Sequence, residues 1–447
     1  MLTNKKRIKS VMDIGNSKIK ILVGSITENT NEIEILGFGE APTLGLKRAL
    51  IEDPEKLTLS IKEAIKSVEE KIGRKISKIT AGISSPHIRS VRANGSITFP
   101  ECEISKNEVD DFFSEVEGKI LKKNERVIKR EMYNIRVNRG GIVKNPLGEV
   151  GRDLQADVHL ICIDEAEYSA YEEVINRAEL IVEEITLNSY GSAESVLNES
   201  EKKSGVALID IGEGITDILI FKNNKLIYSK SIPLGGIHYI GDISYLLQIT
   251  REEARIVLEK LRNKEFVNKN IFLSENKKFE VSKIKDIIDA RTEDIANFIM
   301  KTIEESGFKG YLGKGIVITG GVIILDEIMK KISEITRYVV VKKNPLEMKG
   351  LRKSEPYMAS IIGTMNELLK KEYYKQLENR KNIKVIEEKI EVSLPEKEEE
   401  DLDLKKLNLE LKKEEVDLIE NKNKIETLEN EKKGIIKKTF EWLSNYI

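Results

Sequence analysis

Hydrophobic and polar residues along the first 83 positions alternate in blocks that predict a β-β-β-α-β unit. Apolar runs rich in β-branched residues predict strands at residues 9–14, 19–26, 33–38 and 76–83. Asp53 followed by Pro54 is typical of a helix start, and Gly73 of a helix end. Between these signals, apolar residues recur at helical spacing: Leu57, Ile61, Ile65, Val68 and Ile72.

The pattern changes between about residues 84 and 159, where we expect a separate α+β module. Its predicted elements are a strand at 96–99, an acidic helix from Ser105 onward, and strands at 131–137 and 157–163. Helix, strand and helix patterns then resume at 165–180, 182–187 and 190–198. The module therefore interrupts a domain that closes after it.

A second half begins at Gly205 with a predicted hairpin, whose Asn223-Asn224 turn suits type I′ geometry. Residues 249–308 are predicted to be mostly helical. A strand at 316–319 returns to the core of this half, and a helix at 357–377 completes the folded body.

Two strand-turn-strand segments resemble each other, Asp13-Ile-Gly-Asn-Ser-Lys18 and Asp210-Ile-Gly-Glu-Gly-Ile-Thr-Asp217. In each, an Asp ends a buried strand and a Gly permits a tight turn whose N–H groups can face phosphate oxygens. The Asp carboxylate can hold Mg²⁺ through water. A third segment, Gly315-Ile-Val-Ile-Thr-Gly-Gly321, ends in a glycine pair that lets a nucleoside approach the backbone. The three segments predict a nucleotide cleft between two similar halves.

Composition narrows the possible functions. The 447 residues are 34% charged, yet the net charge is only −2, so no global basic field indicates nucleic acid. Cys102 and Cys162 have no metal or redox spacing and are expected to be buried thiols in a reducing compartment. No signal peptide and no run of 18 apolar residues is visible. We therefore expect a cytoplasmic protein whose membrane contact, if any, is peripheral.

After about residue 377 the composition shifts to Lys, Glu and Asn. Leucines and isoleucines at seven-residue spacing between 404 and 428 allow a two-stranded coiled coil, although Glu414 and Asn421 fall in the same register. A solvated charged linker with transient helix is the favoured interpretation.

The last fourteen residues form an amphipathic pattern. At helical spacing, seven apolar side chains fall within roughly 160° of arc: Ile435, Ile436, Phe440, Trp442, Leu443, Tyr446 and Ile447. Such a helix is only ~21 Å long, too short to span a bilayer, but it can lie in the interface with Lys437 and Lys438 near anionic lipid. The alternative is a helix that docks on this protein's own body or on a partner.

The two phosphate-loop segments and the glycine-pair segment together resemble the phosphate 1, phosphate 2 and adenosine motifs of the actin, Hsp70 and sugar-kinase superfamily. With the inserted module and amphipathic tail, residues 8–375 and the tail resemble the bacterial cell-division family FtsA. Three further segments carry that resemblance: Pro146-Leu-Gly-Glu-Val-Gly-Arg152, Ser231-Ile-Pro-Leu-Gly-Gly236 with Asp242, and Ala290-Arg-Thr-Glu-Asp-Ile295. The resemblance implies an ATP-binding actin homologue that polymerises on the inner membrane face, anchors FtsZ filaments there and recruits later division proteins.

It also implies a bilobed α/β fold with a 1C-type insert in the first lobe, a charged linker and a C-terminal helix. The expected parts are 1–83 and 163–204 as subdomain 1A, 84–162 as the SHS2-like insert 1C, 205–248 and 309–356 as subdomain 2A, 249–308 as subdomain 2B, 357–377 as a helix returning to 1A, 378–432 as linker, and 433–447 as the membrane-targeting helix.

Site residues follow from the resemblance position by position. ATP and Mg²⁺ would be held by two facing loops and an adenosine segment: Asp13, Gly15, Asn16, Ser17 and Lys18; Asp210, Gly212, Gly214 and Thr216; Gly236, Gly320 and Gly321. Asp13 and Asp210 would hold Mg²⁺ through water, while Lys18 as a solvated turn lysine is the alternative. Arg291 and Asp294 match positions that the family uses against the FtsZ C-terminal tail, although a surface ion pair is an equally good account.

Two departures from the family pattern affect the expected chemistry. In the second loop, Glu213 stands where the family usually has glycine, and Ile215 where it has serine or threonine. The Glu213 charge would repel phosphate unless it points outward. Asn188 stands where related ATPases often place a water-orienting group; it can orient water but cannot take its proton. We expect ATP binding with slow or negligible hydrolysis. The alternatives are a sugar-kinase-type phosphotransferase and a PilM-like pilus-assembly ATPase.

Overall fold

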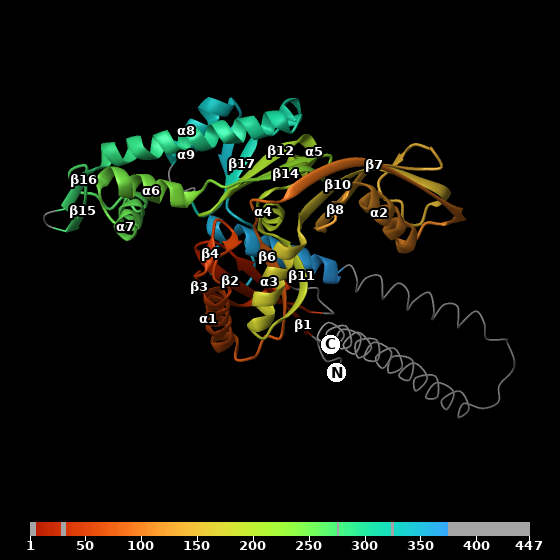
Figure 1. Cartoon of the computed structure of the whole chain (residues 1–447), viewed down its shortest axis with the longest axis horizontal. Helices are drawn as coiled ribbons and strands as arrows, with labels where there is room; N and C mark the ends of the chain where they lie inside the picture. Colours follow the sequence, from red (N-terminus) through yellow and green to blue (C-terminus); the bar gives the residue numbers. More distant parts are fainter. Residues whose placement is uncertain (1–5, 28–32, 275–276, 323–325, 374–447) are drawn as a thin grey trace, which may run out of the picture. The chain divides into compact units, whose positions relative to one another are not determined.

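The computed structural model describes residues 6–27, 33–274, 277–322 and 326–373 (Figure 1). The chain divides into two compact units, residues 1–377 and 378–447, and every described residue belongs to the first. The predicted heptad pattern and amphipathic tail therefore lie outside the described residues. No helix among the described residues is long and apolar enough to cross a membrane.

The first half is built on a five-stranded sheet of order β11-β6-β1-β2-β3. Its strands are β1 (Lys6–Ile14), β2 (Lys18–Thr27), β3 (Ile33–Pro42), β6 (Lys78–Ile83) and β11 (Ile181–Leu187). Side chains alternate between its faces: Met12 and Ile21 pack with α1 (Pro54–Ile72) and α3 (Glu165–Arg177), whereas Val11 and Leu22 pack with the helix at residues 359–373. A minor hairpin, β4 (Leu46–Lys47) and β5 (Leu50–Ile51), precedes α1.

The end signals of the predicted first helix are confirmed. The Asp53 carboxylate accepts a hydrogen bond from the Lys56 backbone N–H at 3.0 Å, and Gly73 closes α1 in the left-handed conformation with φ 67°. Leu57, Ile61 and Val68 are fully buried against the sheet. The 3.6-residue periodicity thus identified both the helix and its inner face.

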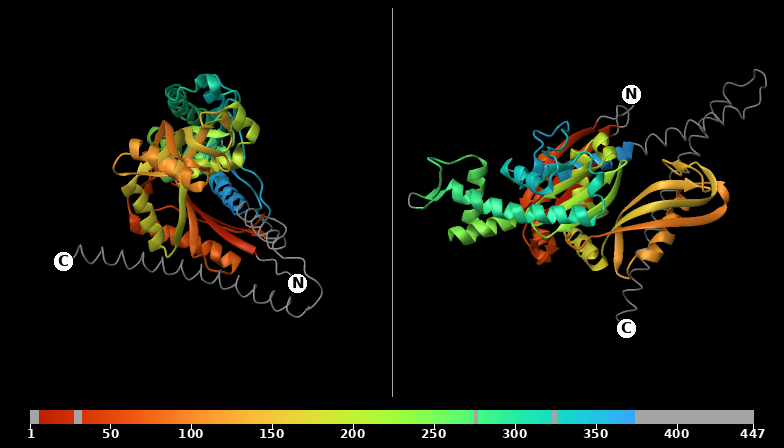
Figure 2. Two further views of the ribbon diagram at one scale, coloured as in Figure 1. Left: turned by 90° about the vertical axis from the view of Figure 1, so that its right-hand side faces the viewer. Right: turned by 90° about the horizontal axis from the view of Figure 1, so that it is seen from above.

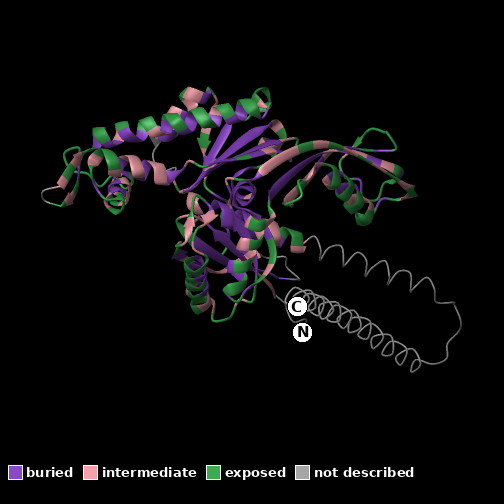
Figure 3. Cartoon of the chain, in the orientation of Figure 1, coloured by how far each residue is buried: buried purple, intermediate pink, exposed green. Residues whose placement is uncertain are grey.

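The inserted module is a four-stranded sheet of order β7-β10-β8-β9 with one helix packed on it. Its elements are β7 (Arg89–Glu103), α2 (Lys106–Ile120), β8 (Glu125–Val137), β9 (Ile142–Val143) and β10 (Val150–Asp164). Ser105 starts α2 with a capping box. The strands predicted for this module are shorter than the observed ones. Along β7 and β8 many positions carry polar residues that face solvent, and these interrupt the apolar pattern used to recognise a strand (Figure 3).

The insert also contacts the second half directly. His159 on β10 is fully buried. Its Nδ1 lies 3.0 Å from the carbonyl oxygen of Leu226 on β14 (Lys225–Ile232), and its Nε2 lies 2.7 Å from Ser90 Oγ of β7. Burial lowers the pKa of His159 to about 4, so the ring is neutral at physiological pH. Two views of the chain show the insert's strands continuing beside the second sheet (Figure 2).

The second half repeats the design with a sheet of order β14-β13-β12-β17-β18. The strands are β12 (Val206–Ile211), β13 (Thr216–Lys222), β14 (Lys225–Ile232), β17 (Ile316–Thr319) and β18 (Val340–Lys342). The β13–β14 turn has Asn223 and Asn224 at φ 52° and 62°, which confirms the type I′ expectation. One face is covered by α6 (Gly236–Leu247), α8 (Val281–Glu305) and α9 (Asp326–Thr336).

The expectation that residues 249–308 are mostly helical was incomplete. Besides α7 (Arg251–Arg262) and α8, this part contains a hairpin of β15 (Asn270–Ser274) and β16 (Lys277–Glu280). Both strands are short and mostly exposed, so the sequence carries little of the apolar alternation that identifies strands. The chain also has three short helical segments: α5 (Glu199–Ser204), η1 (Lys309–Tyr311) and η2 (Pro356–Met358).

Two helices lie between the sheets, and each packs mainly on the sheet of one half. Tyr190, Ala193 and Val196 of α4 (Asn188–Val196) pack against the second sheet, whereas the helix at 359–373 packs against β1 and β2. The two helices cross at glycines: a Cβ on Gly363 would lie 1.7 Å from the Gly191 carbonyl oxygen. Only glycine permits this approach, and we call this contact the helix crossing.

Candidate functional site

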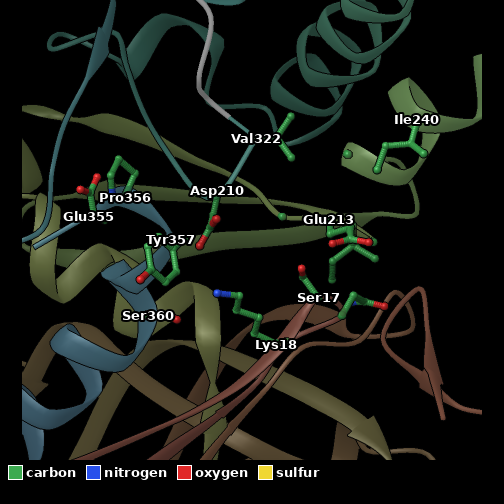
Figure 4. Close-up of a pocket in the computed structure, with 18 of the residues that line it drawn as sticks. Ser17, Lys18, Asp210, Glu213, Ile240, Val322, Glu355, Pro356, Tyr357 and Ser360 are labelled. Carbon is green, nitrogen blue, oxygen red and sulfur yellow. The ribbon is translucent and has the colours of Figure 1, made fainter. Parts of the chain in front are cut away.

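A cavity of about 830 Å³ opens between the two halves, at the end of β1 and β12. The predicted residues that line it come from both loops, from the glycine pair and from the starts of α4 and α6: Asp13, Gly15, Asn16, Ser17, Lys18, Asn188, Asp210, Gly212, Gly214, Gly236, Gly320 and Gly321. Figure 4 shows Ser17 and Lys18 of the first loop opposite Asp210 and Glu213 of the second. Segments about two hundred residues apart in the sequence thus form one cleft.

The first loop, between β1 and β2, is held by hydrogen bonds from the segment that follows β3. Thr43 Oγ1 donates to the Gly15 carbonyl oxygen at 2.7 Å, and the Ala49 N–H donates to Asn16 Oδ1 at 2.8 Å. A Cβ on Gly15 would lie 2.9 Å from the Lys18 carbonyl oxygen, so the turn requires glycine there. The loop is therefore preorganised before any ligand enters.

The second loop, between β12 and β13, approaches the first very closely. The Gly212 N–H donates to the Ile215 carbonyl oxygen at 3.0 Å, and a Cβ on Gly214 would lie 2.5 Å from Asn16 Cγ. The Gly236 N–H donates to the Gly212 carbonyl oxygen at 3.0 Å, so the start of α6 supports this loop. Gly236 therefore lines the cleft while its N–H is engaged by the protein.

The Thr216 side chain was expected to face the phosphates but points away from the cleft. Its side chain is fully buried, its Oγ1 donates to the Leu234 carbonyl oxygen at 2.8 Å, and it does not line the cleft. Because side chains alternate along β13, the neighbouring Asp217 faces the cleft instead. The hydroxyl ties the second loop to the segment before α6.

Each of the two loop carboxylates is held by a serine from one of the crossing helices. Ser360, on the helix at 359–373, donates to Asp13 Oδ2, and Ser192, on α4, donates to Asp210 Oδ2 at 2.5 Å. Neither serine could be predicted from the sequence, because both are distant in the chain from the loops they contact and belong to no motif. Their donors point the two carboxylates into the same cleft.

Lys20 is a cleft residue that the sequence reasoning missed. Its Nζ lies 2.6 Å from Asp13 Oδ2 and donates to the Tyr357 carbonyl oxygen at 2.6 Å, and the residue is 7% exposed. Lys18 is instead partly exposed and paired with Glu40 at the rim, 5.7 Å from the Tyr357 ring centre. The alternation of β2 could have shown that Lys20, two residues inside the strand, shares a face with Lys18.

The expected repulsion between Glu213 and phosphate is offset by a neighbouring cation. Arg255 on α7 donates to Glu213 Oε1 at 2.5 Å, and this contact raises the pKa of Arg255. The Glu213 side chain is therefore neutralised by a residue of the second half. This pairing explains how an acidic residue can stand in a loop of this type.

The electrostatics of the cleft floor favour a bound cation. Burial raises the pKa of Asp210 to about 6, opposed by the Ser192 hydrogen bond and the Lys20 charge. Among the described residues no cluster of three His, Cys, Asp or Glu side chains forms a metal site. Asp13 and Asp210 both present carboxylate oxygens to the cleft, the ligand type that a hydrated Mg²⁺ prefers, so these two residues would hold the metal through water.

Asn188, the candidate water-positioning residue, is buried at the start of α4. Its Nδ2 donates to Ser84 Oγ at 3.3 Å, and its Oδ1 has no hydrogen-bond partner among the described residues.

The two candidate partner-binding residues, Arg291 and Asp294, lie on α8 and contact each other. Arg291 donates two hydrogen bonds to Asp242, at 2.6 and 3.0 Å, and one to Asp294 at 2.9 Å. The surface ion pair between Arg291 and Asp294 is therefore present, on the outer side of α8.

The fold and the cleft define an actin-like bilobed protein with an inserted α+β module. Among solved structures, the PilM-PilN type IV pilus biogenesis complex has a similar fold, with a TM-score of 0.59 over 80% of this chain and 98% of that chain. At 13% identity this likeness concerns the fold alone.

The sequence comparisons identify the family. A family model described as "Cell division protein FtsA" matches residues 207–385, and one described as "SHS2 domain inserted in FTSA" matches residues 85–162. The chain is 28% identical to the cell division protein FtsA of Pseudomonas aeruginosa, covering 76% of this chain and 84% of the relative. It is also 28% identical to FtsA of Neisseria meningitidis, covering 83% and 92%. The chain belongs to the FtsA family of cell-division proteins.

The raised pKa of Asp210 predicts the pH dependence of stability. Since the folded-state pKa of about 6 exceeds the usual 3.8, the Asp210 charge opposes folding above pH 6, and this effect fades as the pH falls towards 4. At pH 8, Asp210→Asn should raise the free energy of unfolding by about 2 kcal/mol and the melting temperature by a few degrees. At pH 4 both quantities should stay close to those of the wild type.

Thermal denaturation at both pH values checks this prediction. Asp110→Asn, at an exposed position on α2, is the matched control and should have no effect at either pH. An Asp210→Asn protein less stable than the wild type at pH 8 would contradict the account.

Proposed function

We propose that this chain binds ATP with Mg²⁺ in the cleft, polymerises at the cytoplasmic face of the cell membrane, and links FtsZ filaments to that membrane at the division site. The observation that carries the proposal is the pair of facing loops whose carboxylates, Asp13 and Asp210, are each held by a serine of a crossing helix. Family membership supports the role in division.

The charges in the cleft support nucleotide binding that depends on a divalent cation. Asp13, Asp210 and Asp217 are grouped at its floor, with Lys20 paired to Asp13. A polyphosphate entering alone would meet these carboxylates. Bound Mg²⁺ would supply the compensating charge between the carboxylates and the phosphate oxygens, while Gly15–Ser17 and Gly212–Gly214 would offer backbone N–H groups.

The two-lobed arrangement supports a nucleotide-controlled assembly state. The loops of both halves border one ligand, and the Asn16–Gly214 approach already brings them together. Nucleotide would therefore favour the arrangement in which both loops engage the phosphates. Such a closed form would be the one that joins to further copies in a filament.

The FtsZ-binding site and the membrane-binding site are proposed on two separate parts of the chain. Arg291 and Asp294 on α8 would contact the acidic or polar C-terminal tail of FtsZ, and the C-terminal segment, with Trp442 and Leu443 on its apolar side, would enter the membrane interface. One short helix binds weakly, and linked copies in a filament bind strongly through multivalency. Other division proteins would be recruited to the filament.

Neither of the two alternative functions, a sugar-kinase-type phosphotransferase or a PilM-like pilus-assembly ATPase, is favoured. The family matches are to cell-division proteins and give no support to a sugar-kinase-type phosphotransferase. The similarity to PilM concerns the fold, and a pilus-assembly role has no sequence support beyond it.

Calorimetric titration of the full chain with ATP tests the cleft. With Mg²⁺ present the wild type should bind ATP. With the metal chelated, its affinity for ATP should fall by roughly tenfold or more, which corresponds to ~1.4 kcal/mol of binding free energy. Asp210→Asn should lose most of that difference, because one of the two metal-facing carboxylates is gone.

The Asp110→Asn protein should retain the full Mg²⁺ effect. Binding of ATP with equal affinity with and without Mg²⁺ would contradict the proposed role of the carboxylates, and no binding under either condition would contradict the nucleotide site itself.

Co-sedimentation with anionic vesicles tests the tether. Trp442→Lys should reduce binding by roughly tenfold or more, since it places a charge on the predicted apolar side. Ser444→Lys adds the same charge on the polar side, and should bind at least as well as the wild type. Equal losses in both variants, or no sedimentation of the wild type, would exclude membrane binding through this segment.

A further inference from the structure

The second loop has little conformational restraint of its own. Gly212 and Gly214 stand on either side of Glu213, and glycine restricts the backbone least of all residues. A Cβ on Gly214 would lie 2.5 Å from Asn16 Cγ, so a shift of this loop also changes its contact with the first loop. The second loop therefore needs support from neighbouring elements if its N–H groups are to keep a fixed position in the cleft.

Backbone hydrogen bonds support the second loop from the start of α6. The Gly236 N–H donates to the Gly212 carbonyl oxygen at 3.0 Å, and the Ile237 N–H donates to the Glu213 carbonyl oxygen at 2.8 Å. These bonds hold two carbonyl groups of the loop. The Glu213 side chain remains available to the cleft, which it lines (Figure 4).

The Glu213 side chain has a second support on α7. Arg255 lines the same cavity and donates to Glu213 Oε1 at 2.5 Å. The two side chains are 40% exposed for Arg255 and 15% exposed for Glu213. Because the carboxylate is largely shielded from water, its attraction to the guanidinium is screened less than that of a fully exposed pair. The ion pair therefore connects the second loop to α7.

The helix α7 is itself firmly held, so it can support a neighbouring loop. Its inner face is buried in the core of the second half through Ala254, Val257 and Leu261. A capping box fixes its start, and Glu253 pairs with Lys277 of the β15–β16 hairpin at 2.5 Å. Arg255 thus extends from a fixed helix to a loop that has two glycines.

We propose that Arg255 is a positioning residue for nucleotide binding, which holds the second loop, through Glu213, in the conformation whose N–H groups receive the phosphates. This inference rests on the proposed binding of nucleotide in the cleft. The Glu213 carboxylate repels phosphate, yet it is also the group by which Arg255 holds the loop. Removal of this acidic side chain should therefore weaken the binding of an anionic ligand, whereas its charge alone would predict the reverse.

Calorimetric titration of the full chain with Mg²⁺-ATP, and with adenosine as a ligand without phosphates, tests this role. Glu213→Ala and Arg255→Met should each weaken Mg²⁺-ATP binding by roughly fivefold to tenfold, since each leaves the loop less preorganised. The double variant should bind as weakly as either single variant, because the same contact is lost in all three. Adenosine affinity should change by less than about twofold, because adenosine does not use the phosphate-binding N–H groups.

Arg251→Met is the matched control for the loss of a positive charge from α7. Arg251 is an exposed arginine at the start of the same helix and does not line the cavity. This variant should bind Mg²⁺-ATP within about twofold of the wild type, because solvent screens its charge. The ligand-free variants should melt within a few degrees of the wild type, since a partly exposed ion pair contributes little to stability.

Three results would overturn the positioning role. If Arg255 only cancels the charge of Glu213, then Glu213→Ala would bind Mg²⁺-ATP at least as tightly as the wild type, and the double variant would regain wild-type affinity. If Arg255 contacts phosphate directly, Arg255→Met and the double variant would bind weakly while Glu213→Ala would not. An equal loss of adenosine binding would show a general disturbance of the cleft. Failure of the wild type to bind Mg²⁺-ATP would instead contradict the proposed function.

Discussion

The close backbone contact at the helix crossing positions both the two sheets and the residues of the cleft. Gly191 of α4 and Gly363 of the last described helix meet backbone to backbone, which leaves no space for a side chain at either position. α4 packs mainly on the second sheet and the helix at 359–373 mainly on the first, so the crossing joins the cores of the two halves. The same helices carry Ser192 and Ser360, which orient the two loop carboxylates. Packing and site geometry therefore have a common origin.

The buried carboxylates of the cleft lower the stability of the ligand-free protein. Asp210 and Asp217 lie side by side with pKa values raised to about 6 and about 7, which means that the empty fold resists their ionisation. Burial is the main cause of both pKa shifts, and a cation bound beside these carboxylates would offset it. Under the proposed function, the binding of metal and nucleotide would therefore be linked to the arrangement of the two halves through the same carboxylates.

Local signals allowed much of the fold to be predicted from sequence, whereas tertiary contacts could not be. Asp53, Pro54 and Gly73 define α1 because capping depends on neighbouring residues, and the two Asp-Ile-Gly turns are visible for the same reason. Lys20, Ser192 and Ser360 belong to no motif, since their roles come from elements brought together by the crossing. The β15–β16 hairpin was missed because exposed strands lack an apolar pattern.

The most direct test of the helix crossing is the substitution Gly363→Ala. The added Cβ would lie 1.7 Å from a backbone oxygen of Gly191, which cannot move without displacing α4, so we expect a loss of roughly 3 kcal/mol or more in folding free energy and weaker Mg²⁺-ATP binding. Gly118→Ala is the matched control, because nothing lies within 4 Å of its Cβ in α2 and alanine favours the helix. Denaturation of both proteins should separate them clearly. Equal stability of the two variants would contradict the central role of the crossing.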